Sequence, residues 1–553
     1  MNRRTTRVLV LAVLFLGAMV SMAIPSFGAD KSVTITLPNS KVTINGQVVN
    51  NNYSKYPLIV YKDITYFPMT FSDCRFLGIE STWTGEKTGL LVDSTGVTAA
   101  YNPYLSSSQN KKNYSAKIVS FPVKVNGKVV DNSKEEYPLL SFRDITYFPM
   151  TWKYSVDAFG WDYKFDGKTG LVIQSKNVKV DQFQIPKTRL VEAYGEYEGK
   201  KSTTVMAKNG FVYYVTNKGA VKQAPLSDIS KAKAILQLGI WSYGDGKQFD
   251  SHAFYEEGGN AMLFFHSGGA TMGSDHRYIL KENGTVQKIQ ESYHETTLIN
   301  NKLYMYYNGP MPGPGNLSVE ELNASGTRSS LGSADYWFYS FCTTKGLPNL
   351  QMIGNELYVR ASNVTGSQEG GGGYITDDPA VYKVDVSTNA VSRVSQSKDK
   401  VIAAQIVGDN LYYMSASGEG SDCTYSIYKH SLIDGAESFV GSFKSELTWD
   451  QSFAVIGENI YYLSNGALYR MGSNESLNPA AEAITMSVTG DHQEYLACTF
   501  KETQQSKYRV MVFDQSGEAV FKTSDCGSNI VIEGKTLYFY NITTETLCKA
   551  VIR

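Results

Sequence analysis

Short runs of alternating apolar and polar residues, separated by turns that contain glycine, predict strands near the start of the chain. Residues 42–49 read Val-Thr-Ile, Asn-Gly and Gln-Val-Val, and the Asn45-Gly46 turn between two alternating runs predicts a β-hairpin. A further strand is expected over residues 63–67, where Pro68 ends it and opens a short helix that runs to Phe76. A last strand is expected over residues 89–92, so this segment predicts a small α+β module.

The same pattern occurs a second time, 81 residues later. The run Asp63–Thr70, which reads Asp-Ile-Thr-Tyr-Phe-Pro-Met-Thr, returns unchanged as Asp144–Thr151, and the hairpin turn returns at Asn126-Gly127. Eight identical consecutive residues at one offset indicate an internal duplication. Residues 33–95 and 116–176 are therefore expected to superpose as two copies of one module.

These two copies resemble a known extracellular module. An Asn-Gly hairpin, a strand ending in Tyr-Phe-Pro-Met, a short helix ending in Leu-Gly or Phe-Gly, and a Gly-Lys-Thr-Gly strand are similar to the copper amine oxidase N-terminal-like "stalk" domain. That family is common on exported proteins of Gram-positive bacteria. The resemblance implies two tandem stalk domains, over residues 30–98 and 116–180. The sequence departs from the family around Trp83, where it reads Thr-Trp-Thr-Gly instead of the more usual Trp-Asp pair.

The family name does not imply oxidase chemistry for this chain. The catalytic oxidase domain needs Asn-Tyr-Asp/Glu for its quinone and a His-x-His pair for copper. Here Asn52-Tyr53 and Asn113-Tyr114 are both followed by Ser, and none of the six His lies two residues from another. Copper and quinone chemistry are therefore not expected.

A weaker repeat runs from about residue 200 to the end of the chain. Its core is a glycine or asparagine turn followed by an apolar and aromatic strand start, as in Gly408-Asp409-Asn410-Leu411-Tyr412. Eight copies, one of them degenerate, begin at Gly210, Gly259, Asn301, Gly354, Gly408, Gly457, Gly490 and Gly534. Their mean spacing of about 46 residues suits one four-stranded propeller blade per repeat.

The fold class predicted is therefore mainly β, with two small α+β stalk modules followed by a seven- or eight-bladed β-propeller over residues 186–553. The Gly-Asp/Glu-Asn-Leu-Tyr-Tyr pattern resembles bacterial propellers related to the low-density-lipoprotein-receptor-related repeats. A β-sandwich pair and a β-solenoid are alternatives, and the even spacing favours the propeller. The run Arg189–Tyr197 is expected to pair with Leu547–Ile552 and so complete the last blade, which would otherwise expose an unpaired edge.

The first residues have the pattern of a cleaved secretory signal peptide, assigned to 1–29. Arg3, Arg4 and Arg7 precede the apolar stretch Val8–Val20, which is too short to span a bilayer, and small residues follow. We therefore expect a secreted or extracellular protein with no membrane span after signal cleavage, and association with the cell wall is one form that this location can take. The net charge of −1 offers no basic field to nucleic acid. Six cysteines without a Cys-x-x-Cys pair fit either one or two disulfides or small buried hydrophobes.

No catalytic residue, metal ligand or cofactor site is predicted. The Gly-Lys-Thr triplets at 167–169 and 534–536 lack the upstream glycine of a phosphate loop, and no Gly-x-Ser-x-Gly or His-Glu-x-x-His motif occurs. Long loops follow the second strand of several repeats, at 266–275, 308–316, 361–378 and 415–422. Because they share one position in the repeat, they are expected on one propeller face. Their acids are the candidate ligand-binding residues, Asp275, Asp377, Asp378, Glu419 and Asp422, since carboxylates bind cations and sugar hydroxyls.

Two functions follow from these patterns. The first is a non-enzymatic exported binding or scaffold protein, whose propeller is presented on stalk modules and binds a cell-wall glycan, an extracellular protein or peptide, or another envelope partner. The second is a propeller enzyme acting on polysaccharide, with loop carboxylates as acid and base. Two carboxyl groups about 5–10 Å apart, one of them with a raised pKa, would favour the enzyme.

Overall fold

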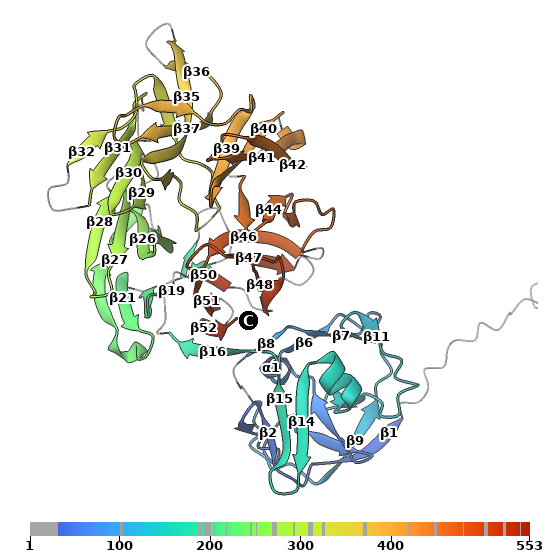
Figure 1. Ribbon diagram of the computed structural model, residues 1–553. Coiled ribbons are helices and arrows are strands. Elements are labelled where there is room, and N and C mark those ends of the chain that lie inside the picture. Colours follow the sequence, from blue (N-terminus) through green and yellow to red (C-terminus); the bar gives the residue numbers. More distant parts are fainter. Residues whose placement is uncertain are drawn as a thin grey trace, which may run out of the picture. The chain divides into compact units, whose positions relative to one another are not determined.

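A computed structural model describes residues 31–552 of the chain. The residues that it leaves out of this range are 100, 102, 186–189, 193–200, 204, 217, 244–245, 250, 268–273, 291–293, 308–312, 323–326, 345, 369–372, 419, 447–450, 479–480, 503–506, 524–526 and 542–543. The chain forms two compact units. The duplicated unit contains the described residues up to Cys74 together with 81–94 and 101–175, and the ring unit contains 75–80, 95–100 and the residues from Lys176 onward. Strands dominate both units, as predicted (Figure 1).

The two copies in the duplicated unit contain the same elements in the same order, which confirms the duplication. The first copy consists of β1 (Ser32–Thr36), β2 (Val42–Ile44), β3 (Gln47–Val48), β4 (Ile59–Tyr61), β5 (Ile64–Pro68), α1 (Phe71–Phe76), β6 (Ile79–Trp83) and β7 (Leu90–Ser94). The second consists of β9 (Asn113–Ile118), β10 (Val123–Val125), β11 (Lys128–Val129), β12 (Leu140–Phe142), β13 (Ile145–Pro149), η1 (Lys153–Ala158), β14 (Trp161–Asp166) and β15 (Gly170–Ser175).

The helix is where the copies differ. In the first copy α1 is an α-helix, whereas η1 in the second is a π-helix in which the Phe159 amide donates to the Tyr154 carbonyl at 3.0 Å. Gly78 and Gly160, which end the two helices, are 82 residues apart instead of 81. A one-residue insertion in a helix is commonly accommodated by a π-turn, because the wider turn takes up the extra residue.

The copies exchange their hairpins instead of folding as two separate modules. Strands β1, β4, β5, β13, β12 and β9 of both copies close one barrel. The β2–β3 hairpin of the first copy pairs with β15 of the second, and the β10–β11 hairpin pairs with β7 of the first. Gly170 permits this pairing, since a Cβ there would lie 2.0 Å from the Lys41 carbonyl oxygen, and Gly89 approaches Pro122 in the same way. The two copies thus form one intertwined unit, and the assignment of residues 30–98 and 116–180 to the stalk family stays a prediction.

The ring unit is a succession of antiparallel sheets, which we label A to H in chain order (Figure 1). Sheets A to H are the larger sheets of the described residues of this unit, and two small sheets, β17 (Leu190–Glu192) with β18 (Lys201–Thr203) and β23 (Ile240–Tyr243) with β24 (Gly246–Phe249), lie outside them. The blade number of seven or eight stays a prediction. Sheet A has β19 (Val205–Lys208), β20 (Phe211–Val215), β21 (Ala220–Pro225) and β22 (Lys233–Gln237); B has β25 (Ser251–Glu257), β26 (Asn260–Ser267), β27 (Ser274–Leu280) and β28 (Val286–Gln290); C has β29 (His294–Ile299), β30 (Lys302–Tyr307), β31 (Leu317–Glu321) and β32 (Arg328–Ser330); D has β33 (Tyr336–Tyr339), β34 (Gln351–Ile353), β35 (Glu356–Ser367), β36 (Tyr374–Thr376), β37 (Ala380–Asp385) and β38 (Val391–Arg393). Sheet E has β39 (Lys400–Val407), β40 (Asn410–Ser417), β41 (Cys423–Ser431) and β42 (Glu437–Ser445); F has β43 (Phe453–Ile456), β44 (Asn459–Ser464) and β45 (Ala467–Arg470); G has β46 (Ala481–Thr489), β47 (Tyr495–Glu502), β48 (Lys507–Phe513) and β49 (Ala519–Thr523); H has β50 (Gly527–Glu533), β51 (Thr536–Asn541) and β52 (Thr546–Val551), with β16 (Val178–Gln184) and β8 (Val97–Thr98).

Apolar clusters between successive sheets close this succession into a ring. Each cluster holds buried residues of two neighbouring sheets: Tyr213 with Leu263, Met262 with Leu303, Tyr304 with Phe338, Val381 with Leu411, Met414 with Ile460, Tyr461 with Leu496, Val512 with Phe539, and Tyr540 with Val212. The last cluster joins sheet H to sheet A. The first strands of neighbouring sheets contact one another and line the interior, as where Gln405 donates to the Val455 carbonyl at 3.0 Å. This closed ring of meandering sheets is the arrangement of a β-propeller.

The ring is completed by a different segment from the one that the sequence suggested. Strand β16 pairs antiparallel with β52, with Val180 opposite Ala550 and Phe183 opposite Leu547. The predicted segment Arg189–Tyr197 lies largely outside the described residues, and its described part, β17 (Leu190–Glu192), pairs with β18 (Lys201–Thr203). The prediction chose the more apolar run, but the strand that completes sheet H faces water on one of its faces, so Lys179 and Asp181 are exposed in β16. The ring therefore includes β16, ahead of residue 186.

A segment of sheet D crosses the interior of the ring. Strands β33 and β34 pair in line with the same edge of β35, and residues 340–350 leave the sheet between them. In this crossing segment the Cys342 amide donates to the Ile402 carbonyl of sheet E at 3.1 Å, and the Thr344 hydroxyl donates to the Phe453 carbonyl of sheet F at 2.9 Å. At Gly346 a Cβ would lie 1.9 Å from the carbonyl oxygen of Val488 in sheet G. The crossing segment thus links sheet D to three further sheets.

Two remaining predictions concern cysteines and membrane spans. Cys74, Cys423, Cys498 and Cys548 are buried, as expected for small hydrophobes, and Cys526 lies outside the described residues. No helix in the described ranges is long and apolar enough to cross a bilayer.

Candidate binding surface

The acids that the sequence singled out belong to three different sheets. Asp275 lies in β27 of sheet B, opposite His266, and Asp377 and Asp378 precede β37 in sheet D. Asp422 of sheet E pairs with Lys444 at 2.7 Å, but both side chains are mostly exposed, so the pair contributes at most about 1 kcal/mol. Asp377 accepts a hydrogen bond from the Asn363 amide at 2.6 Å and so fixes the base of a hairpin. Glu419 lies outside the described residues.

Three aromatic side chains of sheet D lie close together and are at least partly exposed, and we call them the aromatic surface: Trp337, Tyr339 and Tyr374. The run Tyr336–Tyr339 forms β33, in which successive side chains point to opposite faces. Phe338 is buried in the cluster between sheets C and D, so Trp337 and Tyr339 lie together on the other face. Sequence reasoning missed this pair, although four consecutive aromatic residues at 336–339 were a visible signal.

The rings of the aromatic surface have a defined geometry. The Trp337 and Tyr339 rings are parallel within 5°, with centroids 6.2 Å apart, and Tyr374 meets Trp337 edge-on at 5.9 Å. Tyr374 is 47% exposed and its neighbour Ile375 is 50% exposed. Both lie in β36, which pairs with the outer end of the long strand β35 and projects from sheet D (Figure 1). The predicted loop 361–378 is therefore largely a hairpin that carries Tyr374 outward.

Arg360 of β35 lies beside the aromatic surface. It is directly opposite Tyr339 in the sheet register, and its guanidinium lies 5.5 Å from the centre of the Tyr339 ring. Its Nη1 is 3.5 Å from the Ile402 carbonyl oxygen, which is a long hydrogen bond. Its Nε is buried without a hydrogen-bond partner among the described residues. Burial raises the pKa of Tyr339, while Arg360 opposes that rise.

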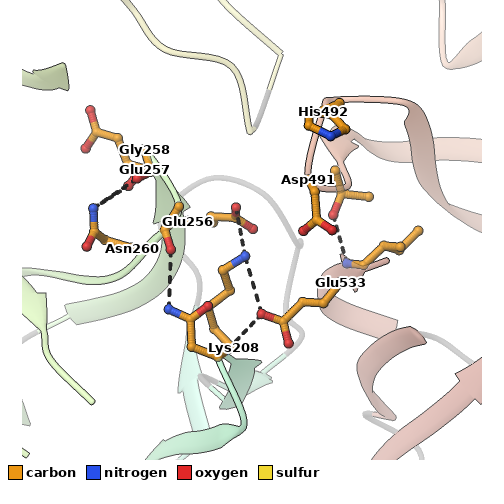
Figure 2. A network of polar contacts seen from close by, with 12 residues as sticks. Lys208, Glu256, Glu257, Gly258, Asn260, Asp491, His492 and Glu533 are labelled. Carbon is orange, nitrogen blue, oxygen red and sulfur yellow. Dashed lines mark hydrogen bonds and ion pairs between the residues drawn. The ribbon is translucent and has the colours of Figure 1, made fainter. Parts of the chain in front are cut away.

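A network of charged side chains around Lys208 lies at the turns between the first and second strands of the sheets. These turns are at the end of the sheets opposite to the aromatic surface. The Lys208 side chain is 5% exposed, and its Nζ lies 3.0 Å from Glu256 Oε1 of sheet B and 3.4 Å from Glu533 Oε1 of sheet H. Figure 2 shows both carboxylates reaching Lys208, while Glu257 points away. The Asn209 amide donates to Glu533 at 2.7 Å. Burial raises the pKa of Glu256, although the Lys208 charge opposes it.

The Lys208 network is suited to holding sheets together. One ammonium group binds two carboxylates, so it links sheet A to both of its neighbours. Asp491 continues the seam by accepting from the Gly534 amide at 2.9 Å, which links sheets G and H. Two neighbouring carboxylates with one raised pKa are also the pattern expected of an acid–base pair, but here both bind the same cation. Among the described residues no group of three His, Cys, Asp or Glu is arranged to hold a metal ion.

Comparison with known proteins gives similarities at the level of structure alone. No protein-family model and no curated protein matches the chain. The ring is similar to β-propeller structures. Among them are dipeptidyl peptidase 4 of Porphyromonas gingivalis (10% identity, 65% of this chain and 59% of that chain, TM-score 0.39), the β-propeller domain of the trilobed protease of Pyrococcus furiosus (10%, 53% and 91%, 0.33) and TolB of Acinetobacter baumannii (11%, 68% and 79%, 0.27). At these values the peptidase and TolB names carry no argument about the activity of this chain.

Proposed function

We propose that this chain is an exported, non-enzymatic binding protein of the cell envelope whose ring holds an extended glycan on the aromatic surface. The observation that carries the proposal is the parallel arrangement of Trp337 and Tyr339 next to the exposed Tyr374. A pyranose ring presents an apolar face of C–H groups, which packs on a flat aromatic face. Parallel rings spaced along a strand offer such faces to successive sugars of one chain.

Two features of the sequence support the exported setting. The first 29 residues have the pattern of a secretory signal, and the duplicated unit resembles the stalk domains of exported proteins of Gram-positive bacteria. We also propose that the ring is a propeller of the type related to the low-density-lipoprotein-receptor-related repeats, which its sequence resembles. In this setting the partner of the aromatic surface is a cell-wall or extracellular polysaccharide, and the acids Asp377 and Asp378 offer acceptors to sugar hydroxyls.

The second candidate, an enzyme acting on polysaccharide, rests on the Glu256 and Glu533 pair. Glu256 has a raised pKa, as a general acid requires, and Glu533 is within reach of the same Lys208 ammonium. Because that ammonium occupies the position between the two carboxylates, we rank this candidate second. Release of new reducing ends from a soluble polysaccharide, abolished by Glu256→Gln, would reverse the ranking.

The binding proposal is tested with the mature chain, residues 30–553, in affinity electrophoresis through gels that contain soluble polysaccharides. Trp337→Ala and Tyr374→Ala are the test variants. Phe439→Ala is the control, because Phe439 is an exposed aromatic residue elsewhere in the ring, 60% accessible against 47% for Tyr374. Loss of an aromatic anchor costs about 2 kcal/mol, so we expect binding to weaken about 30-fold in the test variants and not in the control. Equal retardation of all four proteins would refute the assignment of the aromatic surface.

A further inference from the structure

Arg360 carries a positive charge that no carboxylate of the described residues neutralises at ion-pair distance. Its polar contacts there are the long one to the Ile402 carbonyl oxygen at 3.5 Å and the ring of Tyr339, and its Nε is buried without a partner. Taking a charge out of water is unfavourable unless it is paired. An unmatched guanidinium beside an exposed aromatic surface is thus a candidate for an anionic group of a ligand.

Two other cations of the ring, Arg277 and Lys208, are paired with carboxylates, in contrast to Arg360. Arg277 of sheet B also lies against an aromatic ring, that of Phe264, but its Nη2 lies 2.7 Å from Glu295 Oε2. Lys208 is paired with two glutamates. Burial alone does not explain why Arg277 has a carboxylate partner and Arg360 has none in the described part of the chain, because both residues are partly accessible to solvent.

We propose that the ligand of the aromatic surface is an anionic polysaccharide and that Arg360 binds its carboxylate or phosphate group. This inference rests on the proposed function. The Nη groups of a planar guanidinium donate N–H groups to the oxygens of a carboxylate or phosphate, and at Arg360 only Nη1 has a hydrogen-bond contact among the described residues, the long one to Ile402. A sugar packed on Tyr339 would place such a substituent next to Arg360.

The neighbouring acids give the surface a direction. Arg360 is level with Tyr339, whereas Asp377 exchanges hydrogen bonds with the backbone of Asn363, three residues further along β35 toward Tyr374. The acidic substituent therefore belongs at the Tyr339 end of the aromatic surface. The sugar hydroxyls belong near Asp377 and Asp378, where an anionic substituent would be repelled.

The test compares an acidic polysaccharide with its uncharged ester and with a phosphate polymer. The mature chain is titrated with polygalacturonate, with its fully methyl-esterified form, and with poly(glycerol phosphate), in buffers of increasing salt concentration. The variants are Arg360→Gln, Arg360→Lys and Lys429→Gln. Lys429 is the matched control, since it is a cation that lies over the ring of Tyr412 in sheet E, at 5.9 Å.

We expect the unaltered chain to bind an acidic polymer at least tenfold more tightly than the methyl ester. Arg360→Gln should lower the affinity to that of the ester, Arg360→Lys should keep part of the preference, and Lys429→Gln should keep all of it. Preference for polygalacturonate would identify a carboxylate as the anionic group, and preference for poly(glycerol phosphate) would identify a phosphate. Binding that depends on Trp337 but is equal for charged and esterified polymers would overturn this inference and leave the proposed function standing. Absence of binding to every polymer would overturn both.

Discussion

Replacing Gly346 by alanine tests whether the crossing segment is seated against sheet G. The backbone of Gly346 has φ +86°, and a Cβ there would lie 1.9 Å from the Val488 carbonyl oxygen and 3.0 Å from its carbon. An ordinary carbon–oxygen contact is about 3.3 Å or longer. The segment or strand β46 would therefore have to move by more than about 1 Å, and neither is an adaptable side-chain tip.

The size of the effect can be separated into two parts. A left-handed backbone at a residue with a Cβ costs about 1–2 kcal/mol, and overpacking typically costs a further 1–3 kcal/mol. Gly354→Ala is the control for the first part, because Gly354 also has a positive φ of +58° but nothing lies within 4 Å of its added Cβ. We expect Gly346→Ala to lower the free energy of unfolding by about 2 kcal/mol more than Gly354→Ala does.

The assay is urea unfolding followed by tryptophan fluorescence and far-ultraviolet circular dichroism, with all three proteins at equal concentration. A 2 kcal/mol difference corresponds to about a 30-fold change in the folded-to-unfolded ratio, which the midpoints resolve. If the two variants are destabilised equally, only the backbone term operates, and the close approach of the crossing segment to Val488 does not exist in solution.

The remaining predictions concern ionisable groups of the ring. Lys208→Met leaves Glu256 and Glu533 partly buried without their cation, so the free energy of unfolding should fall by about 3 kcal/mol at pH 7.5. The loss should be smaller at pH 5, because burial raises the pKa of Glu256 and its carboxyl gains protons there; urea midpoints at both pH values measure this, and a deficit that grows on acidification would contradict it. Burial raises the pKa of Glu257 to about 7. The folded state therefore binds this proton more tightly than the unfolded state does, and the contribution of Glu257 to stability falls as pH rises from about 4.5 to 7. Glu257→Gln keeps an acceptor for the Leu298 amide, 3.0 Å away, and should raise stability at pH 8 by up to about 3 kcal/mol with little change at pH 4, in the same urea assay; an equal effect at both pH values would show that ionisation of Glu257 is not involved.

The duplication and the ring repeat were readable from sequence because both depend on local chemistry. Asn45 and Asn126 adopt positive φ angles of 45° and 47° in their turns, and an Asn-Gly pair strongly favours that conformation. The turn glycines Gly354, Gly408, Gly457 and Gly534 likewise adopt positive φ between the first and second strands of their sheets. Such signals lie within a few residues of the structure that they specify.

Exchange of hairpins between the copies is a long-range choice that the sequence leaves open. Both copies end in Lys-Thr-Gly-Leu, so the hairpin at residues 42–48 meets nearly the same strand whether it pairs within its copy or with the other. The aromatic surface was missed for another reason. The sequence-based prediction selected acids in loops, such as Asp377, which binds a nearby backbone amide. Trp337 and Tyr374 are far apart along the chain and come together only because both of their strands pair with β35.

The pairing of β16 with β52 has a consequence for the synthesis of the chain. Val180 and its partner Ala550 are 370 residues apart, and translation at ~5–20 residues per second needs roughly 20–70 s to cover that distance. Throughout that interval β16 has no β52 to pair with, and an unpaired strand edge is a site of aggregation and of chaperone capture. A chain that stops anywhere before sheet H is complete keeps that edge open. The open edge of β16 therefore marks a ring that is not yet closed, and it disappears when β52 pairs with it.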